Sequence, residues 1–225
     1  MLAPLATASA PPPSPALPPE ISAAERARLQ QVVENATVST RIEAEPFPGR
    51  REVFEYLLDH PEFATHVTRT LRVARYRIWR TPEGLFLDDG WGATGHFSIA
   101  YAASGTRVFH AQGQYDQRIL PSIHGQGVVV IEYGFRAAAE GRTQVTTTVT
   151  GFVKLESRLL ALASKLAMGV ASRKADLEAR RLMKVFAKVS RALEEDPGRV
   201  YAELRQRPDV PQRELEEFRV LLNLR

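Results

Sequence analysis

The sequence predicts an α+β fold with seven strands, six of them in an antiparallel meander, two short helices after the first strand and one long C-terminal helix. Three observations support this prediction. Between Arg72 and Lys154, short runs rich in β-branched and aromatic residues are separated by turn signals. From 157 to 196 the apolar period becomes helical. Before these segments, one alternating run is followed by two short helical runs.

The composition limits the classes of function. The 225 residues are 44% apolar and include no cysteine. They suffice for one good core and exclude disulfides, zinc–thiolate sites and thiol nucleophiles. The net charge of +4 permits contact with anionic phosphate groups without requiring it. No apolar run reaches the roughly 18 residues of a transmembrane helix.

The chain has four predicted parts. The first is an Ala/Pro-rich segment that cannot pack a core, and its Ala8-Ser9-Ala10 suits a signal-peptide cleavage site. The charged start of a leader is missing, so an exported and a cytoplasmic location stay equally open. A helix follows, which Ser22 caps with Glu25 three residues later. The parts are a disordered segment 1–20, the helix 21–36, a main domain 37–195 and a helical extension 196–225.

The spacing of apolar residues and the positions of turn-forming residues predict the elements of the main domain. "TVSTRIEAEPF" alternates like a strand and ends at prolines. "GRREVFEYLLDH" and "PEFATHVTRTL" have helical periods and join at Pro61, which disfavours a helical continuation at His60. Turn signals then separate six strands, at about 72–80, 85–91, 96–103, 107–117, 127–137 and 143–154.

His60 and His66 lie near several carboxylates, which suggests a metal site at first sight. A helix cannot place both histidines on one face, because they are six residues apart. Only Glu62 and His66 have the spacing of a helical metal motif. We therefore expect no metal site, and expect both histidines at the polar rim of a helix corner. The side chains expected to face inward there are Phe54, Leu57, Leu58 and Phe63.

The turns predict which strand residues share a face. In an antiparallel meander, facing residues have a nearly constant index sum, and the three turns give sums of about 210, 242 and 280. One face, the inner face, then collects Phe97, Ile99, Tyr101, Phe109, Ala111, Val129, Ile131, Tyr133, Val145 and Val149. The opposite, wet face collects His96, Ser98, His110, Gln112, Gln114, Glu132, Thr148 and Thr150.

The inner face carries an aromatic belt of Tyr101, Phe109 and Tyr133. The belt either packs under the long helix or lines a ligand cavity in which the tyrosine hydroxyls hold a polar head group. His110 and Glu132 are predicted to be cross-strand neighbours on the wet face. We expect no catalytic role for them, because an exposed polar pair of this kind only adds a little stability to the sheet. The sequence has no nucleophile elbow, HExxH motif or phosphate-binding loop. The remaining acid/base candidates are Tyr76, Asp89, Tyr101 and Tyr133.

The long helix is predicted to have an apolar and a basic side. The apolar side is formed by Leu159, Leu162, Leu166 and Val170, continued by Leu177, Leu182, Phe186, Val189 and Leu193. The basic side is formed by Arg173, Arg180, Arg181, Lys184, Lys188 and Arg191. This basic side is either an ordinary solvated face or a contact with anionic lipid. Nucleic acid is not expected, because no aromatic residues interleave with the cations.

Three stretches, in their order along the chain, resemble the START/Bet v 1-like superfamily, also called SRPBCC or helix-grip. "REVFEYLLDHPEFATHVTRTL" looks like its paired short helices, "LRVARYRIWRTPEGLF" like the following hairpin, and "TTTVTGFVKLESRLLALASKL" like its last strand running into the long helix. The resemblance covers about 37–195. It implies a helix-grip fold, in which a curved antiparallel sheet of seven strands wraps around the long C-terminal helix and encloses an apolar cavity. Tyr76, Leu162 and Leu166 would contribute to this cavity beside the inner-face residues.

The resemblance implies binding and transport of a hydrophobic small molecule, such as a lipid, quinone or polyketide-like compound, without a cofactor. Two alternatives stay open: a cyclase or aromatase that uses the same cavity, and a non-catalytic scaffold with a filled core. The segment "LPSIHGQG" (120–127) is the expected gate beside the cavity mouth, since it places apolar side chains among glycines. The gate residues would be Leu120, Pro121 and Ile123.

Overall fold

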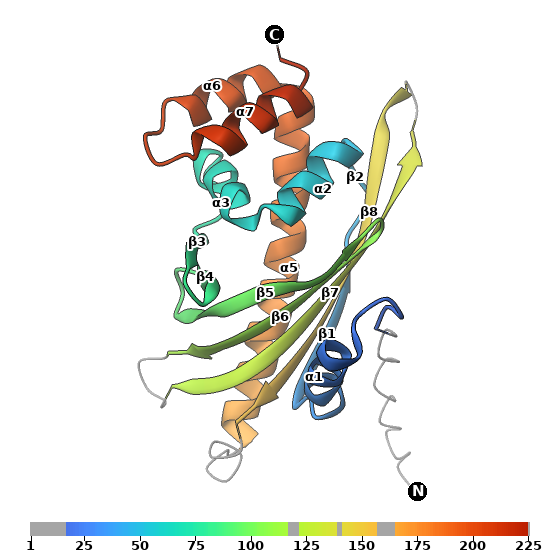
Figure 1. Ribbon diagram of the computed structural model, residues 1–225, viewed down its shortest axis with the longest axis vertical. Coiled ribbons are helices and arrows are strands. Elements are labelled where there is room, and N and C mark those ends of the chain that lie inside the picture. The colour runs from blue at the N-terminus through green and yellow to red at the C-terminus, as the bar shows by residue number, and fades with distance from the viewer. Residues whose placement is uncertain (1–16, 117–121, 139–140, 157–164, 225) are drawn as a thin grey trace, which may run out of the picture.

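The computed structural model describes residues 17–116, 122–138, 141–156 and 165–224, without the side chains of 165–168 and 170. These residues form eight strands and six helices (Figure 1). The strands are β1 (Val38–Glu43), β2 (Phe47–Pro48), β3 (Arg77–Thr81), β4 (Gly84–Asp88), β5 (Ala93–Ala103), β6 (Thr106–Tyr115), β7 (Ile123–Ala137) and β8 (Thr143–Leu155). The helices are α1 (Ala23–Glu34), α2 (Arg51–Asp59), α3 (Pro61–Thr70), α5 (Lys165–Glu195), α6 (Pro197–Arg205) and α7 (Gln212–Leu221).

The α+β architecture is that of an open antiparallel sheet with a long helix near the C-terminal end of the chain. The strand order is β1-β8-β7-β6-β5-β4-β3, and β2 pairs with β8 beside β1. The predicted count of seven strands was therefore wrong by one. The additional strand is β2, which contains Pro48 and pairs on one side only, as proline allows at a sheet edge.

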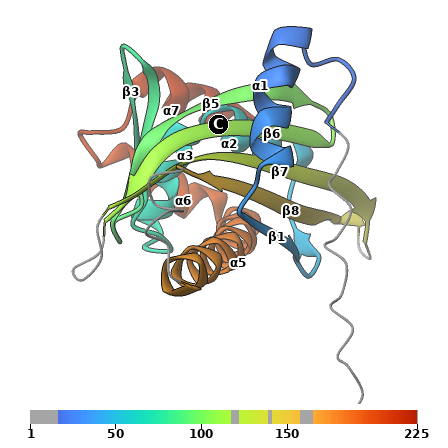
Figure 2. The same cartoon turned by 90° about the horizontal axis from the view of Figure 1, so that it is seen from below.

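The sheet lies between two helices of very different length. In Figure 2, α5 lies on one face and α1 crosses the other. We call the face toward α5 the inner face and the face toward α1 the outer face. None of the helices in the described part of the chain combines the length and the apolar character needed to cross a membrane.

The strand registers agree with the sequence in one ladder and differ in two. Between β7 and β8, Tyr133 faces Thr147 as predicted. Phe109, however, faces Ile99 on β5 instead of the expected Tyr101. On β7 it faces Val129 instead of the expected Tyr133. These shifts are even-numbered, so most side chains keep their predicted face.

The altered registers separate the two residues that looked like a cross-strand pair. His110 faces Val128, whereas Glu132 faces Thr106. The predicted neighbourhood of His110 and Glu132 was therefore wrong.

A β-bulge in β5 overturns one inner-face prediction. The pairing with β6 changes register between Ile99 and Tyr101, so Tyr101 faces Val108. An extra residue at a bulge turns the following side chains to the opposite face. Tyr101 consequently lies on the outer face, where its hydroxyl donates to Glu20 Oε2 at 3.2 Å.

Helix α1 covers part of the face that was expected to be wet. As predicted, Ser22 caps this helix, and its Oγ accepts from the Glu25 N–H at 3.4 Å. Leu29 and Val32 on α1 are fully buried. The hydrophobic cluster that they form with the sheet also contains Ile21, Val108, Val128, Val130 and Phe152. His110 lies on this face and is only 8% exposed.

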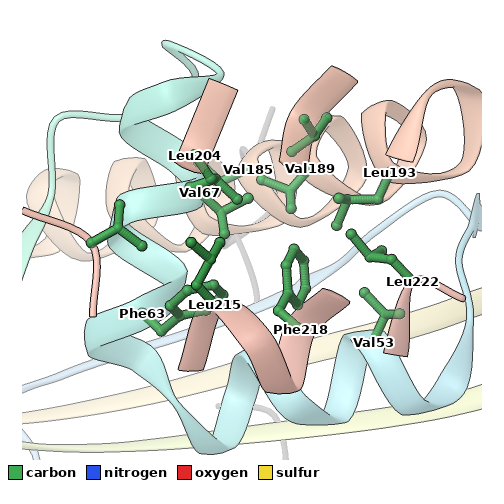
Figure 3. Close-up of a cluster of buried hydrophobic side chains, with 12 residues drawn as sticks. Val53, Phe63, Val67, Val185, Val189, Leu193, Leu204, Leu215, Phe218 and Leu222 are labelled. Carbon is green, nitrogen blue, oxygen red and sulfur yellow. The ribbon is translucent and has the colours of Figure 1, made fainter. Parts of the chain in front are cut away.

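The C-terminal extension shares a core with the main domain (Figure 3). Helices α6 and α7 pack against α2, α3 and the last turns of α5. Phe218 at the centre of this cluster is fully buried and contacts the ring of Phe63 at 5.1 Å between centroids. Arg50 ties the parts together, since its Nε donates to Glu194 at 3.1 Å and its Nη1 donates to the carbonyl of Leu221 at 3.4 Å.

Candidate functional site

An apolar cavity of about 440 Å³ lies between the inner face of the sheet, helix α5 and the α2–α3 corner. Small-molecule sites in proteins typically have about 300–1,000 Å³. The cavity reaches from Thr40 on β1 across the sheet to Ile78 on β3. It is therefore large enough for a small organic molecule and is built from all layers of the fold.

The cavity exists because small residues stand in the middle of the inner face. Gly151 lies between Thr40 and Val129 in one cross-strand row, and Gly127 lies beside Ala111 in the next. A β-carbon added at Gly127 would meet no atom closer than 3.6 Å. Larger side chains at these positions would fill the space under α5.

Seven residues predicted for the cavity line it: Tyr76, Phe97, Phe109, Ala111, Val129, Ile131 and Val149. Tyr133 and Val145 belong to the neighbouring packed cluster instead, and Ile99 does not reach the cavity. Tyr101 is on the other face of the sheet. Leu162 and the side chain of Leu166 lie outside the described residues.

The helices supply the rest of the wall. Phe54, Leu57 and Leu58 on α2 face inward into the cavity, whereas Phe63 on α3 points into the core with α7. On α5, the predicted apolar side continues through three lining residues: Leu182, Phe186 and Val189. Leu177 departs from it and is 46% exposed. The side facing the cavity at this turn is occupied by Ala175, Glu178 and Ala179.

A buried carboxylate closes the end of the cavity near the β4–β5 turn. Asp89 is only 2% exposed. Its Oδ1 accepts from the backbone N–H groups of Trp91 at 2.7 Å and Ala93 at 2.9 Å, and its Oδ2 accepts from Lys174 Nζ at 2.5 Å. Asp89 therefore fixes the turn and holds α5 against the sheet.

A second carboxylate completes this polar cluster. Glu178 Oε1 accepts from Lys174 at 3.1 Å and from Arg181 at 2.6 Å, and its Oε2 accepts from the Tyr76 hydroxyl at 2.9 Å. Burial, together with the adjacent Glu178 carboxylate, raises the pKa of Tyr76 far above its ordinary value. The cluster pairs two carboxylates with two cations. Sequence analysis singled out Tyr76 and Asp89, but missed Lys174 and Glu178.

The hydroxyl of Tyr133 lies in a different polar cluster. It accepts from Arg107 Nη1 at 2.6 Å and donates to Glu55 at 3.2 Å, while Arg107 also forms two bonds to Asp59 at 2.7 and 2.9 Å. Burial raises the pKa of Tyr133 to about 12, against the opposing effect of Arg107. Tyr133 thus secures the end of α2, and its hydroxyl does not line the cavity.

Thr40 on β1 also lines the cavity and was missed by the sequence analysis. It is 8% exposed, and its Oγ1 has no hydrogen-bond partner among the described residues. The signal for its position was the alternation of Val38, Thr40 and Ile42 along one strand, which places all three on the inner face.

Of the predicted gate residues, only Ile123 lies within the described part of the chain. It belongs to β7, is buried and faces Tyr115, so the strand begins earlier than the turn signals suggested. Leu120 and Pro121 lie outside the described residues.

Five of the six predicted basic residues follow one exposed side of α5: Arg173, Arg180, Lys184, Lys188 and Arg191. We call these five the basic stripe. Their spacing of three, four or seven residues keeps them on one side of the helix, and Leu177 lies among them. Arg181 departs from the stripe, because it pairs with Glu178 and lies over the ring of Trp91 at 4.2 Å.

His60 and His66 at the helix corner each contact a neighbouring side chain. His60 stacks on Tyr56 at 4.2 Å between centroids. His66 Nδ1 lies 3.6 Å from Asp209 Oδ2, and burial lowers the pKa of His66. Within the described ranges, no group of three His, Asp or Glu side chains is arranged to hold a metal ion.

Comparison with known proteins adds little to this geometry. No protein-family model matches the sequence, and no curated protein is similar to it. Among solved structures, the hypothetical protein jhp0584 from Helicobacter pylori is similar with a TM-score of 0.36 and 8% sequence identity. The match covers 68% of this chain and 86% of that one. The class that the coordinates define is an α+β protein with an open antiparallel sheet, and the START/Bet v 1-like family stays a prediction.

Proposed function

We propose that the protein is a helix-grip carrier that binds a hydrophobic small molecule, of lipid, quinone or polyketide-like character, in the cavity beneath α5. The observation that carries the proposal is the cavity of about 440 Å³ with its aromatic and aliphatic wall. Removing apolar surface from water contributes about 25 cal/mol per Å², so a hydrophobic guest is the one that such a wall favours.

The polar groups of the site favour a carrier over a cyclase or aromatase. A general acid or base needs a pKa near the working pH and access to the substrate. Asp89 is tied to Lys174 and two backbone N–H groups. Tyr76 is bonded to Glu178, and its pKa is strongly raised. Tyr101 and Tyr133 do not line the cavity. The cavity volume likewise argues against a scaffold whose core is filled by its own side chains.

The test compares two neighbouring residues on opposite faces of β6. Ala111 lines the cavity, whereas Gln112 is exposed on the outer face. Ala111→Phe should weaken binding of the fluorescent probe N-phenyl-1-naphthylamine by about tenfold or more, because the ring occupies the cavity. Gln112→Phe adds the same ring and should leave the affinity unchanged. Organic extraction followed by mass spectrometry of the purified protein would then identify the natural guest.

A second cavity-filling variant distinguishes a filled cavity from a folding defect as the cause of lost binding. Gly127→Val places two methyl groups into space where the nearest atom to the β-carbon is 3.6 Å away. Both filling variants should unfold cooperatively and lose the probe. Retention of the probe by both, or equal loss in Gln112→Phe, would refute the cavity as the binding site.

We also propose that the basic stripe touches an anionic membrane surface during delivery. The specific observation is that its five cations are exposed along one side of α5, with an exposed Leu177 among them. Each cation near an anionic surface contributes about 1 kcal/mol before the entropic cost of docking. This amounts to reversible association, which suits a carrier that must leave again.

Sedimentation with liposomes tests the membrane contact. Binding to phosphatidylglycerol vesicles should exceed binding to phosphatidylcholine vesicles at about 0.1 M salt, and should disappear near 1 M, where the Debye length falls to about 3 Å. Lys184→Glu with Lys188→Glu should abolish the preference. The matched control, Arg75→Glu with Arg205→Glu, changes the net charge equally at exposed positions away from the stripe. Equal loss in both pairs would show that only net charge matters.

A further inference from the structure

We infer, on the basis of the proposed binding function, that the part of the ligand held inside the cavity is a plain hydrocarbon, such as an acyl or isoprenoid chain, and that any polar group of the ligand stays at the opening. The exposed surface of the described wall is almost wholly apolar, and the cavity opens to solvent rather than being sealed. This assignment narrows the proposed guest. A quinone would enter by its isoprenoid tail, and a polyketide with oxygens along its whole length would be excluded.

The threonines of the wall present carbon atoms to the cavity. The Oγ1 of Thr40 is closed off from the cavity, and its methyl group Cγ2 is the atom that lies beside Gly151. The hydroxyls of Thr65 and Thr68 donate to carbonyls in their own helix, at 2.8 and 3.1 Å. Three residues that are polar by type therefore contribute apolar surface, and a ligand oxygen beside them would find no partner.

The charged groups at one end of the cavity bond to one another. Lys174 Nζ donates to Asp89 at 2.5 Å and to Glu178 at 3.1 Å. Glu178 also accepts from Arg181 at 2.6 Å and from the Tyr76 hydroxyl at 2.9 Å. The described wall thus offers no unpaired cation to a carboxylate or phosphate. An anionic head group has to remain in water at the opening, because burying an unpaired charge is strongly unfavourable.

Ser190 on α5 is the remaining hydroxyl of the described wall. It is 8% exposed and lies beside Gly49, where an added β-carbon would be 3.3 Å from its oxygen. A serine hydroxyl has one hydrogen to donate, so it can satisfy one carbonyl oxygen. A quinone ring or a polyketide carries several such oxygens. The others would be buried without partners, which favours a hydrocarbon over either compound.

The experiment compares two isomers, 1-decanol and 5-decanol, as competitors of N-phenyl-1-naphthylamine. They contain the same atoms and differ in the position of the hydroxyl group. The chain of 1-decanol can enter the cavity while its hydroxyl stays in water, whereas 5-decanol has to bury its hydroxyl or leave half of its chain outside. We expect 1-decanol to bind about tenfold or more tightly than 5-decanol, since a buried unpaired hydroxyl loses its bonds to water.

A matched pair of variants locates the competition. Ala111→Phe fills the cavity and should weaken the displacement by both isomers, whereas Gln112→Phe on the outer face should affect neither. Equal affinities of the two isomers for the unaltered protein would overturn the hydrocarbon assignment and leave the cavity as the binding site. Failure of both isomers to displace the probe, combined with unaltered probe binding in Ala111→Phe, would overturn the proposed function itself.

Discussion

The two faces of the sheet are built by alternate residues of the same strands, but one is packed and the other encloses a cavity. Val128 points to the outer face and is fully buried against α1. Gly127 and Val129, its neighbours in the chain, both line the cavity. The outer face carries β-branched residues where the inner face carries Gly127, Gly151 and Ala111. Residue size at alternate positions, rather than apolar content, therefore decides which face has room for a guest.

The two faces also differ in how deeply their ion pairs are buried. On the outer face, Arg41 and Glu132 form an exposed pair at 3.4 Å. On the inner side, Lys174 and Asp89 form a buried pair at 2.5 Å that holds the long helix on the sheet. An ion pair thus contributes little to stability on the outer face, whereas on the inner side it holds the long helix on the sheet.

The largest expected effect comes from breaking the buried pair. Lys174→Met leaves the Asp89 carboxylate buried without its cation, and should lower the free energy of unfolding by about 3–5 kcal/mol. Glu132→Gln on the outer face should cost at most about 1 kcal/mol, because the pair is exposed. Urea denaturation of both variants measures the difference. Similar losses would mean that the inner pair is as well solvated as the outer one.

A smaller effect should distinguish the packing of the two faces. Leu29→Ala on α1 creates a new void in a packed region, and should cost about 2–5 kcal/mol. Leu182→Ala on α5 only enlarges an existing cavity and should cost less than that range. Denaturation midpoints at equal m-values give the comparison. A larger cost for Leu182→Ala would indicate that the space under α5 is closed by side-chain packing.

The smallest expected effect is a pH dependence of stability to which His110 on the outer face contributes. Burial holds the pKa of His110 below its ordinary value, and Arg28 on α1 lowers it further, against Glu25 and a bond with Gln126. The unfolded chain binds this proton below about pH 6.5, whereas the folded chain binds it only at lower pH. The contribution of His110 to the free energy of unfolding should therefore be constant above about pH 6.5 and fall as the pH drops below it.

His110→Gln should remove part of that pH-dependent loss, as read from denaturation midpoints at about pH 7.5 and 5.5. The remainder belongs in part to His66, whose pKa is lowered too. No histidine lines the described cavity wall, so probe affinity should not follow the same curve. An unchanged slope in His110→Gln would show that His110 binds its proton as easily in the folded state.

Much of the inner face was predictable because strand alternation and turn signals are local. The β7–β8 register was predicted correctly, since the turn between them is short and marked by Gly141. The bulge after Ile99 was not predictable, because nothing in the neighbouring alanines marks it. Its consequence was the wrong face for Tyr101.

Long-range contacts account for the remaining misses. Asp89 and Lys174 are 85 positions apart, and no local pattern connects them. The period of α1 indicates an apolar side but not the surface on which it docks, so the outer face was expected to be wet. Gly127 suggested a flexible loop, whereas in the sheet its missing side chain helps to form the cavity.

The extension that packs on α2 and α3 also affects the order in which the protein can be made. Phe218 and Leu222 complete the core beneath the helices that form one wall of the cavity. During synthesis, which adds about 5–20 residues per second, these side chains leave the ribosome after the whole sheet and the long helix. Until then, the apolar surface of the α2–α3 corner is open to other partners. Synthesis therefore includes a stage at which this apolar surface is exposed and the nascent chain is prone to aggregation.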